Sequence, residues 1–244
     1  MTRELPDPRS VRTLLLDAGG VLVRPSFTRV ARALLEQGVE ARPEALAAAE
    51  VLARKDMDRP PEPSPARAER RTFAYFDMVL EQAGIAPSPA TEAALVALKG
   101  WHHDHNLWED VFEGVRPSLA RFRAAGLRLA VVSNANGTVQ RLFERLDLAR
   151  FFDVIVDSQI EGIEKPDPRL FRIALERVGG GAGEALHVGD MYHVDVVGAR
   201  AAGLRVVLVD EGGLHPQADC PRVRSLAELA AHLAPEVGAP GHFC

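Results

Sequence analysis

Residues 14–22 of the chain read LLLDAGGVL. Three leucines in a row, without polar alternation, are typical of a strand buried on both faces of a parallel sheet. The run ends at Asp17, and Gly19 and Gly20 follow, so we expect a tight turn directly after a carboxylate. Ligands of open parallel sheets bind at the carboxyl ends of the strands. Asp17 is therefore the first candidate for a functional residue.

Further short apolar runs occur after residue 113, separated by stretches with helical spacing. This alternation predicts an α/β fold, a Rossmann-like parallel sheet core with helices on both faces. The expected strands are 12–16, 127–133, 154–156, 185–188 and 205–209, and the expected helices of this part are 117–125, 138–148, 168–178, 195–202 and 226–233.

Residues 24–113 break this alternation, because they carry helical patterns without strand-like runs. We therefore expect a helical domain, 24–113, inserted into a core domain formed by residues 1–23 and 114–244. Phe73, Phe76 and Leu80 recur with helical spacing and are predicted to face the core of this insertion. Its expected helices are 27–37, 44–55, 66–83 and 88–98, with a proline-rich loop at 59–65.

The composition excludes several classes of protein. Among the 244 residues, 47% are hydrophobic and 26% charged, which is typical of a soluble globular protein. A net charge of −5 gives no electrostatic footprint for nucleic acid. No apolar run approaches the roughly 18 residues of a membrane span, and the first residues lack the apolar stretch of a secretory signal. The only cysteines, Cys220 and Cys244, fit a reducing cytoplasm, so we expect a cytoplasmic protein. We expect no nucleic-acid or membrane partner, and either a monomer or a homodimer.

Three other segments place chemical groups beside strands of the predicted sheet. Ser133 ends a strand within LAVVSNANG, Asp190 and Asp195 follow another within LHVGDMYHVD, and Lys165 lies in the connection GIEKPDP. We expect these groups to meet Asp17 in one crevice, because parallel strands present their carboxyl ends along one edge.

This set suits phosphoryl transfer. A carboxylate can act as nucleophile and form an acyl phosphate. A lysine, a hydroxyl and Mg²⁺ compensate the charge of the phosphoryl oxygens, as do backbone N–H groups such as those expected at Gly19 and Gly20. Mg²⁺ prefers one or two carboxylates together with waters and substrate phosphate, and Asp17 with Asp190 would form such a pair.

The segments DAGGVL, SNANG, EKPDP and VGDMYHVD, in this order, resemble the four motifs of the haloacid dehalogenase-like hydrolases. EGVRPSLARFRAAG before the second motif and VGARAAGL after the fourth are similar too. The spacing resembles that of members with a helical cap inserted after the first motif, and the resemblance covers nearly the whole chain. It implies a Mg²⁺-dependent phosphatase that hydrolyses a small phosphorylated metabolite through an aspartyl-phosphate.

The resemblance also implies residue roles. Asp17 would be the nucleophile and a metal ligand, Ser133 would bind the phosphoryl group, and Lys165 would neutralise it and hold Asp17. Asp190 would complete the metal site, with Asp195 beside it or reaching the metal through water. The expected phosphate-binding residues are Gly19, Gly20, Ser133, Asn134 (through its backbone) and Lys165, and the expected metal ligands are Asp17, Gly19 (through its carbonyl), Asp190 and Asp195.

One position departs from the family pattern. Most phosphatases of this family carry a second aspartate two positions after the nucleophile, as general acid and base, and here that position is Gly19. A positioned acid contributes typically about 10²–10⁴ in rate. Two alternatives therefore stay open, a metal-independent 2-haloacid dehalogenase and a binding or regulatory protein with weak turnover. The acidic pair Asp190 and Asp195 favours metal and phosphate over the dehalogenase.

The segment WHHDHNLW, residues 101–108, is the unusual part of the expected insertion. Its spacing resembles no standard zinc site. It is interpreted either as a polar turn or as a lip of the cap that faces the substrate. A histidine at 102, 103 or 105 that replaced the missing acid would give a pH–rate limb near its usual pKa of about 6.5.

Overall fold

The computed structural model describes residues 4–58 and 67–235. Its centre is a six-stranded sheet in the order β5-β4-β1-β6-β7-β8, in which every neighbouring pair is parallel. Each predicted strand lies within one residue of an observed strand at both ends, and the α/β fold class is confirmed. The strands of this sheet are β1 (Thr13–Leu16), β4 (Arg128–Ser133), β5 (Val154–Asp157), β6 (Ala185–Gly189), β7 (Arg205–Val209) and β8 (Arg222–Val223).

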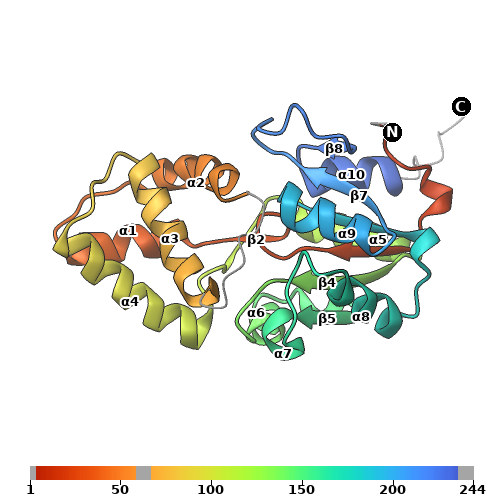
Figure 1. Cartoon of the computed structure of the whole chain (residues 1–244), viewed down its shortest axis with the longest axis horizontal. Coiled ribbons are helices and arrows are strands. Elements are labelled where there is room, and N and C mark those ends of the chain that lie inside the picture. Colours follow the sequence, from red (N-terminus) through yellow and green to blue (C-terminus); the bar gives the residue numbers. More distant parts are fainter. Residues whose placement is uncertain (1–3, 59–66, 236–244) are drawn as a thin grey trace, which may run out of the picture.

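Helices cover both faces of the sheet (Figure 1). Leu14 and Leu16 of β1 join the hydrophobic core on one face, whereas Leu15 joins the core on the other. Burial on both sides explains why the central strands are apolar at every position. One face carries α5 (Val115–Ala124), α6 (Val139–Arg145) and α10 (Leu226–Leu233), and the other carries α8 (Pro168–Val178), α9 (Val197–Ala201) and the π-helix η4 (Tyr192–Val196). Short helical turns complete this part as η1 (Pro8–Ser10), η2 (Ala149–Phe151), α7 (Ser158–Glu161) and η3 (Ala182–Glu184).

The helix predicted at 195–202 begins earlier than expected. Its first turn is η4, which starts at Tyr192 and continues directly into α9. Single π-helical turns within helices are rare and are frequent at functional sites. Asp195 therefore lies inside a helical turn, fully buried, rather than at a helix start.

Four helices lie between β2 (Val23–Arg24) and β3 (Asp110–Val111), which pair with each other in antiparallel orientation. We call these four helices the helical insertion. They lie beside the sheet in Figure 1 and enclose a hydrophobic core of their own. Phe76 and Leu80 belong to that core as predicted, whereas the side chain of Phe73 and the loop 59–65 lie outside the described residues. The helices are α1 (Phe27–Glu36), α2 (Pro43–Met57), α3 (Arg67–Gln82) and α4 (Pro89–His105). The domain limits at residues 24 and 113 stay a prediction.

Helix α4 is longer than the sequence predicted. Residues 101–105 form its last turns, so the interpretation of these residues as a polar turn was wrong. Trp101 and His102 are half-buried while His103 and His105 face solvent, and the helix ends at Asn106 with φ of 63°. Histidines in the last turn are favourable at a helix end, and asparagine adopts a positive φ more readily than most residues.

No helix within residues 4–58 and 67–235 combines the length and the apolar character that crossing a membrane requires.

The core of the helical insertion can be tested with two adjacent leucines. Leu34 is fully buried, whereas Leu35 is 61% exposed. We expect Leu34→Ala to lower the free energy of unfolding by about 2–5 kcal/mol and Leu35→Ala to change it by less than about 0.5 kcal/mol. Urea unfolding followed by circular dichroism measures both. Equal losses for the two variants would contradict the packing of α1 described above.

Candidate active site

The carboxyl ends of β1, β4 and β6 bring the predicted residues together. Because β4 and β6 flank β1, Ser133 and Asp190 lie on either side of Asp17 along the same sheet edge. Asp17 and Asp190 directly follow β1 and β6, and Ser133 is the last residue of β4. All three are buried, with 5–9% of their surface exposed. The site is thus built on rigid strand ends.

Lys165 is the central cation of this site. It is 2% exposed, and its Nζ lies 2.8 Å from Oδ1 of Asp17 and 2.7 Å from Oδ1 of Asp195. Burial lowers the pKa of a lysine, but here the two carboxylates outweigh burial and hold the pKa of Lys165 above its usual value. The ammonium group therefore stays charged between two acids.

Asp195 is held from three directions. Its Oδ1 contacts Lys165 and lies 3.0 Å from Nε2 of His187, and its Oδ2 accepts a hydrogen bond from the backbone N–H of Met191 at 3.1 Å. Burial raises the pKa of this carboxyl, but Lys165 and His187 outweigh it, and the pKa lies below its ordinary value. A Cβ on Gly189 would lie 2.2 Å from Cγ of Asp195, so a glycine is required at this strand end.

Asp190 faces the helical insertion. Its Oδ2 accepts a hydrogen bond at 2.9 Å from Nη1 of Arg54, which comes from α2. Burial and the nearby Asp17 and Asp195 raise the pKa of Asp190 to about 8, although Arg54 opposes this shift. A carboxyl group with so high a pKa lies in surroundings that favour additional positive charge.

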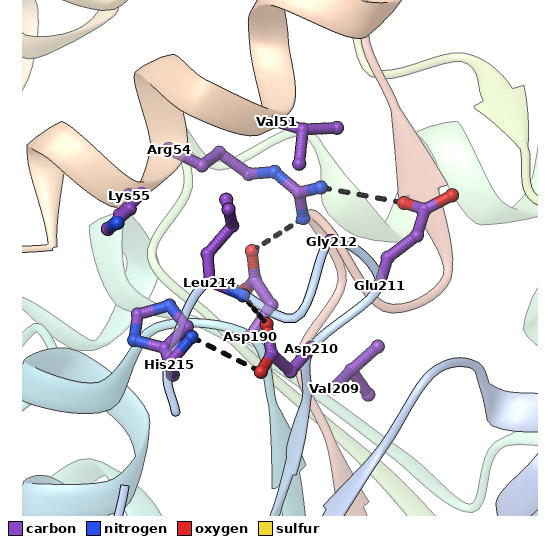
Figure 2. Close-up of a pocket in the computed structure, with 10 residues that line it drawn as sticks. All are labelled: Val51, Arg54, Lys55, Asp190, Val209, Asp210, Glu211, Gly212, Leu214 and His215. Carbon is purple, nitrogen blue, oxygen red and sulfur yellow. Dashed lines mark hydrogen bonds and ion pairs between the residues drawn. The ribbon is translucent and has the colours of Figure 1, made fainter. Parts of the chain in front are cut away.

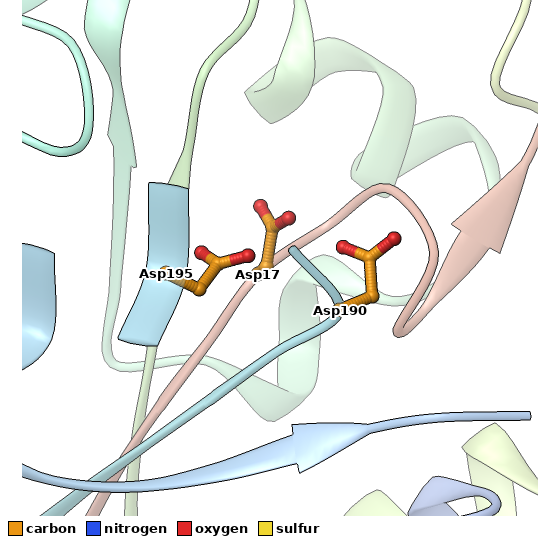
Figure 3. Close-up of side chains that lie close together, drawn as sticks. All are labelled: Asp17, Asp190 and Asp195. Atoms are coloured by element: carbon orange, nitrogen blue, oxygen red, sulfur yellow. The ribbon is translucent and has the colours of Figure 1, made fainter. Parts of the chain in front are cut away.

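Three carboxylates could hold a metal ion together. Asp17, Asp190 and Asp195 each offer an oxygen, and these oxygens lie within 4.8 Å of one another. Figure 3 shows Asp17 between the other two. Such a cluster of hard oxygen donors fits Mg²⁺. The contacts of Asp195 with Lys165, His187 and Met191 engage both of its oxygens, so Asp17 and Asp190 offer the better placed ligands.

Gly20 is required by the turn that follows Asp17. Gly20 has φ of +73°, and a Cβ there would lie 2.1 Å from Oδ2 of Asp190. Its backbone N–H, predicted to face a phosphate, donates instead to the carbonyl of Val23 at 2.9 Å. The phosphate-binding role expected for Gly20 stays a prediction. The predicted roles of Gly19 as phosphate contact and metal ligand stay predictions.

The side chain of Asn134 makes two hydrogen bonds to the backbone of Lys165. Its Nδ2 donates to the carbonyl of Lys165 at 2.9 Å, and its Oδ1 accepts from the N–H of the same residue at 2.7 Å. Both ends of the amide side chain therefore fix the backbone of Lys165 against the end of β4. The predicted contact of the Asn134 backbone with phosphate stays a prediction, as does that of Ser133.

The sequence analysis missed the residues that the helical insertion contributes. Beside Arg54, the buried Asp58 accepts hydrogen bonds from the backbone N–H groups of Tyr192 at 2.5 Å and His193 at 2.8 Å. The C-terminal end of α2 is thus fastened to the segment that follows Asp190. No local pattern marks these residues, because their partners lie more than a hundred positions away in the sequence.

His187 was also missed, although a signal existed. It is a fully buried polar residue inside an otherwise apolar strand. Such a residue is stable there only with a partner, which here is Asp195.

A small hollow opens between α2 and the loop that follows β7, beside Asp190 (Figure 2). Arg54 reaches across it toward Asp190, and its Nη2 lies 3.7 Å from Oε2 of Glu211. The loop is held by Asp210, which accepts from the backbone N–H groups of Leu214 at 2.7 Å and His215 at 3.2 Å. The hollow therefore adjoins the carboxylate cluster from the side of the insertion.

Comparison with known proteins shows which family this chain matches. The haloacid dehalogenase-like hydrolases match residues 11–203, which include Asp17, Ser133, Lys165, Asp190 and Asp195. The chain belongs to the haloacid dehalogenase-like hydrolases. The family membership expected from the four motifs is confirmed.

Relatives of this hydrolase carry different activities in their names. It is similar to phosphoserine phosphatase of Thermus thermophilus, with 40% identity over 145 residues, 58% of this chain and 55% of that protein. It is also similar to haloacid dehalogenase-like hydrolase domain-containing protein 3 of Mus musculus, with 36% identity over 138 residues, 55% of each. The hydrolase thus spans about half the length of these curated relatives. A solved dehalogenase shares the fold, with a TM-score of 0.63 at 22% identity over 94% of this chain and 99% of that one.

The role of Lys165 in holding the site can be tested by removing its charge. Lys165→Met keeps most of the volume but leaves Asp17 and Asp195 buried without their cation. We expect the free energy of unfolding of the metal-free hydrolase to fall by about 3–5 kcal/mol, because breaking a buried ion pair leaves uncompensated charge. Arg32→Met, which breaks an exposed ion pair with Glu36, is the control, because such pairs contribute little to stability. Urea unfolding that showed the same stability for both variants would contradict the buried ion pairs.

Proposed function

We propose that this hydrolase is a Mg²⁺-dependent phosphatase that hydrolyses a small phosphorylated metabolite through an aspartyl-phosphate at Asp17. The observation that carries the proposal is the buried ammonium of Lys165 on Asp17, beside a cluster of three carboxylates. A nucleophilic carboxylate, a fixed cation and a metal site are the parts that phosphoryl transfer needs. The name of the relative from Thermus thermophilus supports this reaction class.

In the first step, Asp17 attacks the phosphorus atom of the substrate. Lys165 and the backbone N–H of Ala18 both contact Oδ1 of Asp17, at 2.8 Å each, so we assign the attack to Oδ2. A bond forms between this oxygen and phosphorus, and the bond from phosphorus to the ester oxygen breaks with its electron pair going to that oxygen. Lys165 compensates the negative charge of the phosphoryl group, and the hydroxyl of Ser133, at the end of β4, would donate a hydrogen bond to it.

In the second step, water attacks the phosphorus atom of the aspartyl-phosphate, which returns Asp17 as a carboxylate and releases phosphate. Mg²⁺, held by Asp17 and Asp190, would withdraw charge from the phosphoryl oxygens. Asp195 holds Lys165 in place through both steps. The helical insertion, which lies over the site through Arg54 and Asp58, would act as the cap that excludes bulk water and selects the substrate.

The experiment that tests this function is a screen of phosphate release, with and without Mg²⁺, over a panel of phosphorylated metabolites. 2-Chloropropionate serves as the dehalogenase substrate in the same screen. Phosphate release that requires Mg²⁺ supports the proposal. Metal-independent release of chloride would establish the dehalogenase instead, and the absence of both reactions would favour a binding or regulatory protein.

Replacement of the nucleophile gives a second test. Asp17→Asn is nearly isosteric, so we expect a folded protein that releases phosphate at less than a few per cent of the parent rate. Asp147→Asn, at an exposed carboxylate with 66% of its side chain accessible, should keep the parent rate. Turnover by Asp17→Asn near the parent rate would remove Asp17 from this role.

The metal site can be tested without turnover. Asp190→Ala removes one ligand and should weaken Mg²⁺ binding at least about tenfold, because even residues that only support metal ligands contribute this much. Calorimetric titration with Mg²⁺ measures the affinity directly. Asp104→Ala, on the exposed side of α4, is the matched control. Equal Mg²⁺ affinity in the two variants would place the ion elsewhere.

A further inference from the structure

Trp108, in the segment between α4 and β3, fills the space beside Gly19. A Cβ built on Gly19 would lie 3.3 Å from Nε1 and 3.5 Å from Cδ1 of Trp108. The nitrogen-bearing edge of the indole ring therefore borders the place where a side chain at position 19 would stand. The residue two positions after the proposed nucleophile has no side chain of its own, and an aromatic N–H donor from another part of the chain faces its position.

Trp108 is fixed in this position by the loop after β4. Its backbone N–H donates to Oδ1 of Asn106 at 3.0 Å, and Nδ2 of Asn106 donates to Oγ1 of Thr138 at 2.8 Å. The ring of His102 packs edge-on against the indole, with 5.3 Å between ring centroids. Nε2 of His102 lies 3.1 Å from Nδ2 of Asn136. Asn106 and His102 thus hold Trp108 against residues 136–138, in the loop that follows Ser133 in the sequence.

His102 itself is a poor source of the missing proton. Burial lowers its pKa, and its Nδ1 accepts a hydrogen bond from the backbone N–H of Leu107 at 3.1 Å. His103 and His105 are exposed at the end of α4. Of the unusual segment 101–108, the residue that borders Gly19 is therefore Trp108.

A chain of contacts through Tyr75, Glu50 and Arg54 links Trp108 to Asp190. The ring centroids of Tyr75 and Trp108 lie 5.6 Å apart. The Tyr75 hydroxyl donates a hydrogen bond to Oε1 of Glu50 at 2.7 Å. Glu50 pairs with Arg54, which pairs with Asp190. Trp108 packs against the hydrophobic cores of both the sheet domain and the insertion. The indole thus forms one wall of the proposed active site rather than part of an isolated surface.

We propose that Trp108 is a specificity-determining residue, whose indole N–H donates a hydrogen bond to the leaving oxygen of the substrate in the space beside Gly19. This inference rests on the phosphatase function proposed above. When the bond from phosphorus to the ester oxygen breaks, the electron pair stays on that oxygen. The indole N–H stabilises the charge, and water supplies the proton.

The substrate class follows from the chemistry of indole. An indole N–H donates a hydrogen bond but neither accepts one nor gives up its proton at ordinary pH. It therefore assists departure without acid catalysis, whereas a carboxylic acid would protonate the leaving oxygen. The hydrolase should prefer phosphate esters of acidic hydroxyl groups, such as enol or aryl phosphates, over alkyl phosphates.

Trp108→Phe tests the hydrogen bond, because it removes the N–H and keeps an aromatic ring. The measurement is kcat/KM over a series of phosphate monoesters whose leaving groups differ in pKa. We expect a loss of about tenfold for alkyl esters, the size of one hydrogen bond to a charged group, and a smaller loss for aryl esters. The dependence of log kcat/KM on leaving-group pKa becomes steeper. Trp101→Phe, at the indole that stacks on His105, leaves the dependence unchanged. An unchanged slope in Trp108→Phe overturns the inference.

Gly19→Asp gives an independent test of the shared space. Alone, the new side chain meets the indole, and activity on alkyl phosphates falls. In the Trp108→Ala background the same substitution has room, and it raises kcat/KM for alkyl phosphates above that of Trp108→Ala alone. Additive effects of the two substitutions would show that positions 19 and 108 do not share a space.

A readout without turnover separates this inference from the proposed function. The chain has two tryptophans, so Trp101→Phe leaves Trp108 as its single indole. We expect its emission to change when orthovanadate and Mg²⁺ are added, and no such change in Trp108→Phe. Phosphate release by the parent, with no emission change and no change of slope, overturns the inference and leaves the phosphatase in place. If the parent releases no phosphate from any ester, the function fails, and with it the inference on the leaving oxygen.

Discussion

The rest of the site depends on one buried ammonium group. Lys165 lies between Asp17 and Asp195, and all three side chains are largely removed from water. Charges in such surroundings are stable only when they are paired and hydrogen-bonded, so the structure around Lys165 is tightly constrained. Asn134 fixes its backbone, His187 and the N–H of Met191 hold Asp195, and Gly189 makes room for that carboxylate.

The second cation of the site comes from the helical insertion. Arg54 pairs with Asp190, while Asp58 accepts hydrogen bonds from the segment that follows it. Three carboxylates at the sheet edge therefore face two cations, one lysine from the core and one arginine from the insertion. The insertion also supplies Tyr75 and Phe76, whose rings pack against Trp108. The sheet thus carries the reacting groups, and the insertion decides what surrounds them.

The sequence predicted the sheet and its site because both are encoded locally. Apolar runs marked the strands, and the groups at their ends, Asp17, Ser133 and Asp190, were readable without a structure. The contacts of Arg54 and Asp58 were not readable, since they depend on how the insertion is placed against the sheet. The last turns of α4 were misread because polar residues there suggest a turn. On a half-exposed helix, however, such polar residues, here His103 and His105, face solvent. Trp101 packs against the core of the insertion and His102 against Trp108.

The antiparallel pair β2–β3 bears on how the sheet assembles. Leu16 of β1 pairs with Val131 of β4, more than a hundred positions later, because the insertion lies between them. Once the insertion is folded, Val23 and Val111 lie opposite each other, so the chain between the two strands acts as a much shorter loop. The entropy lost on closing a loop grows with the logarithm of its length, and the shorter path lowers this cost by about 1 kcal/mol. The insertion, with its own hydrophobic core, thereby makes the central strand pairing easier to form.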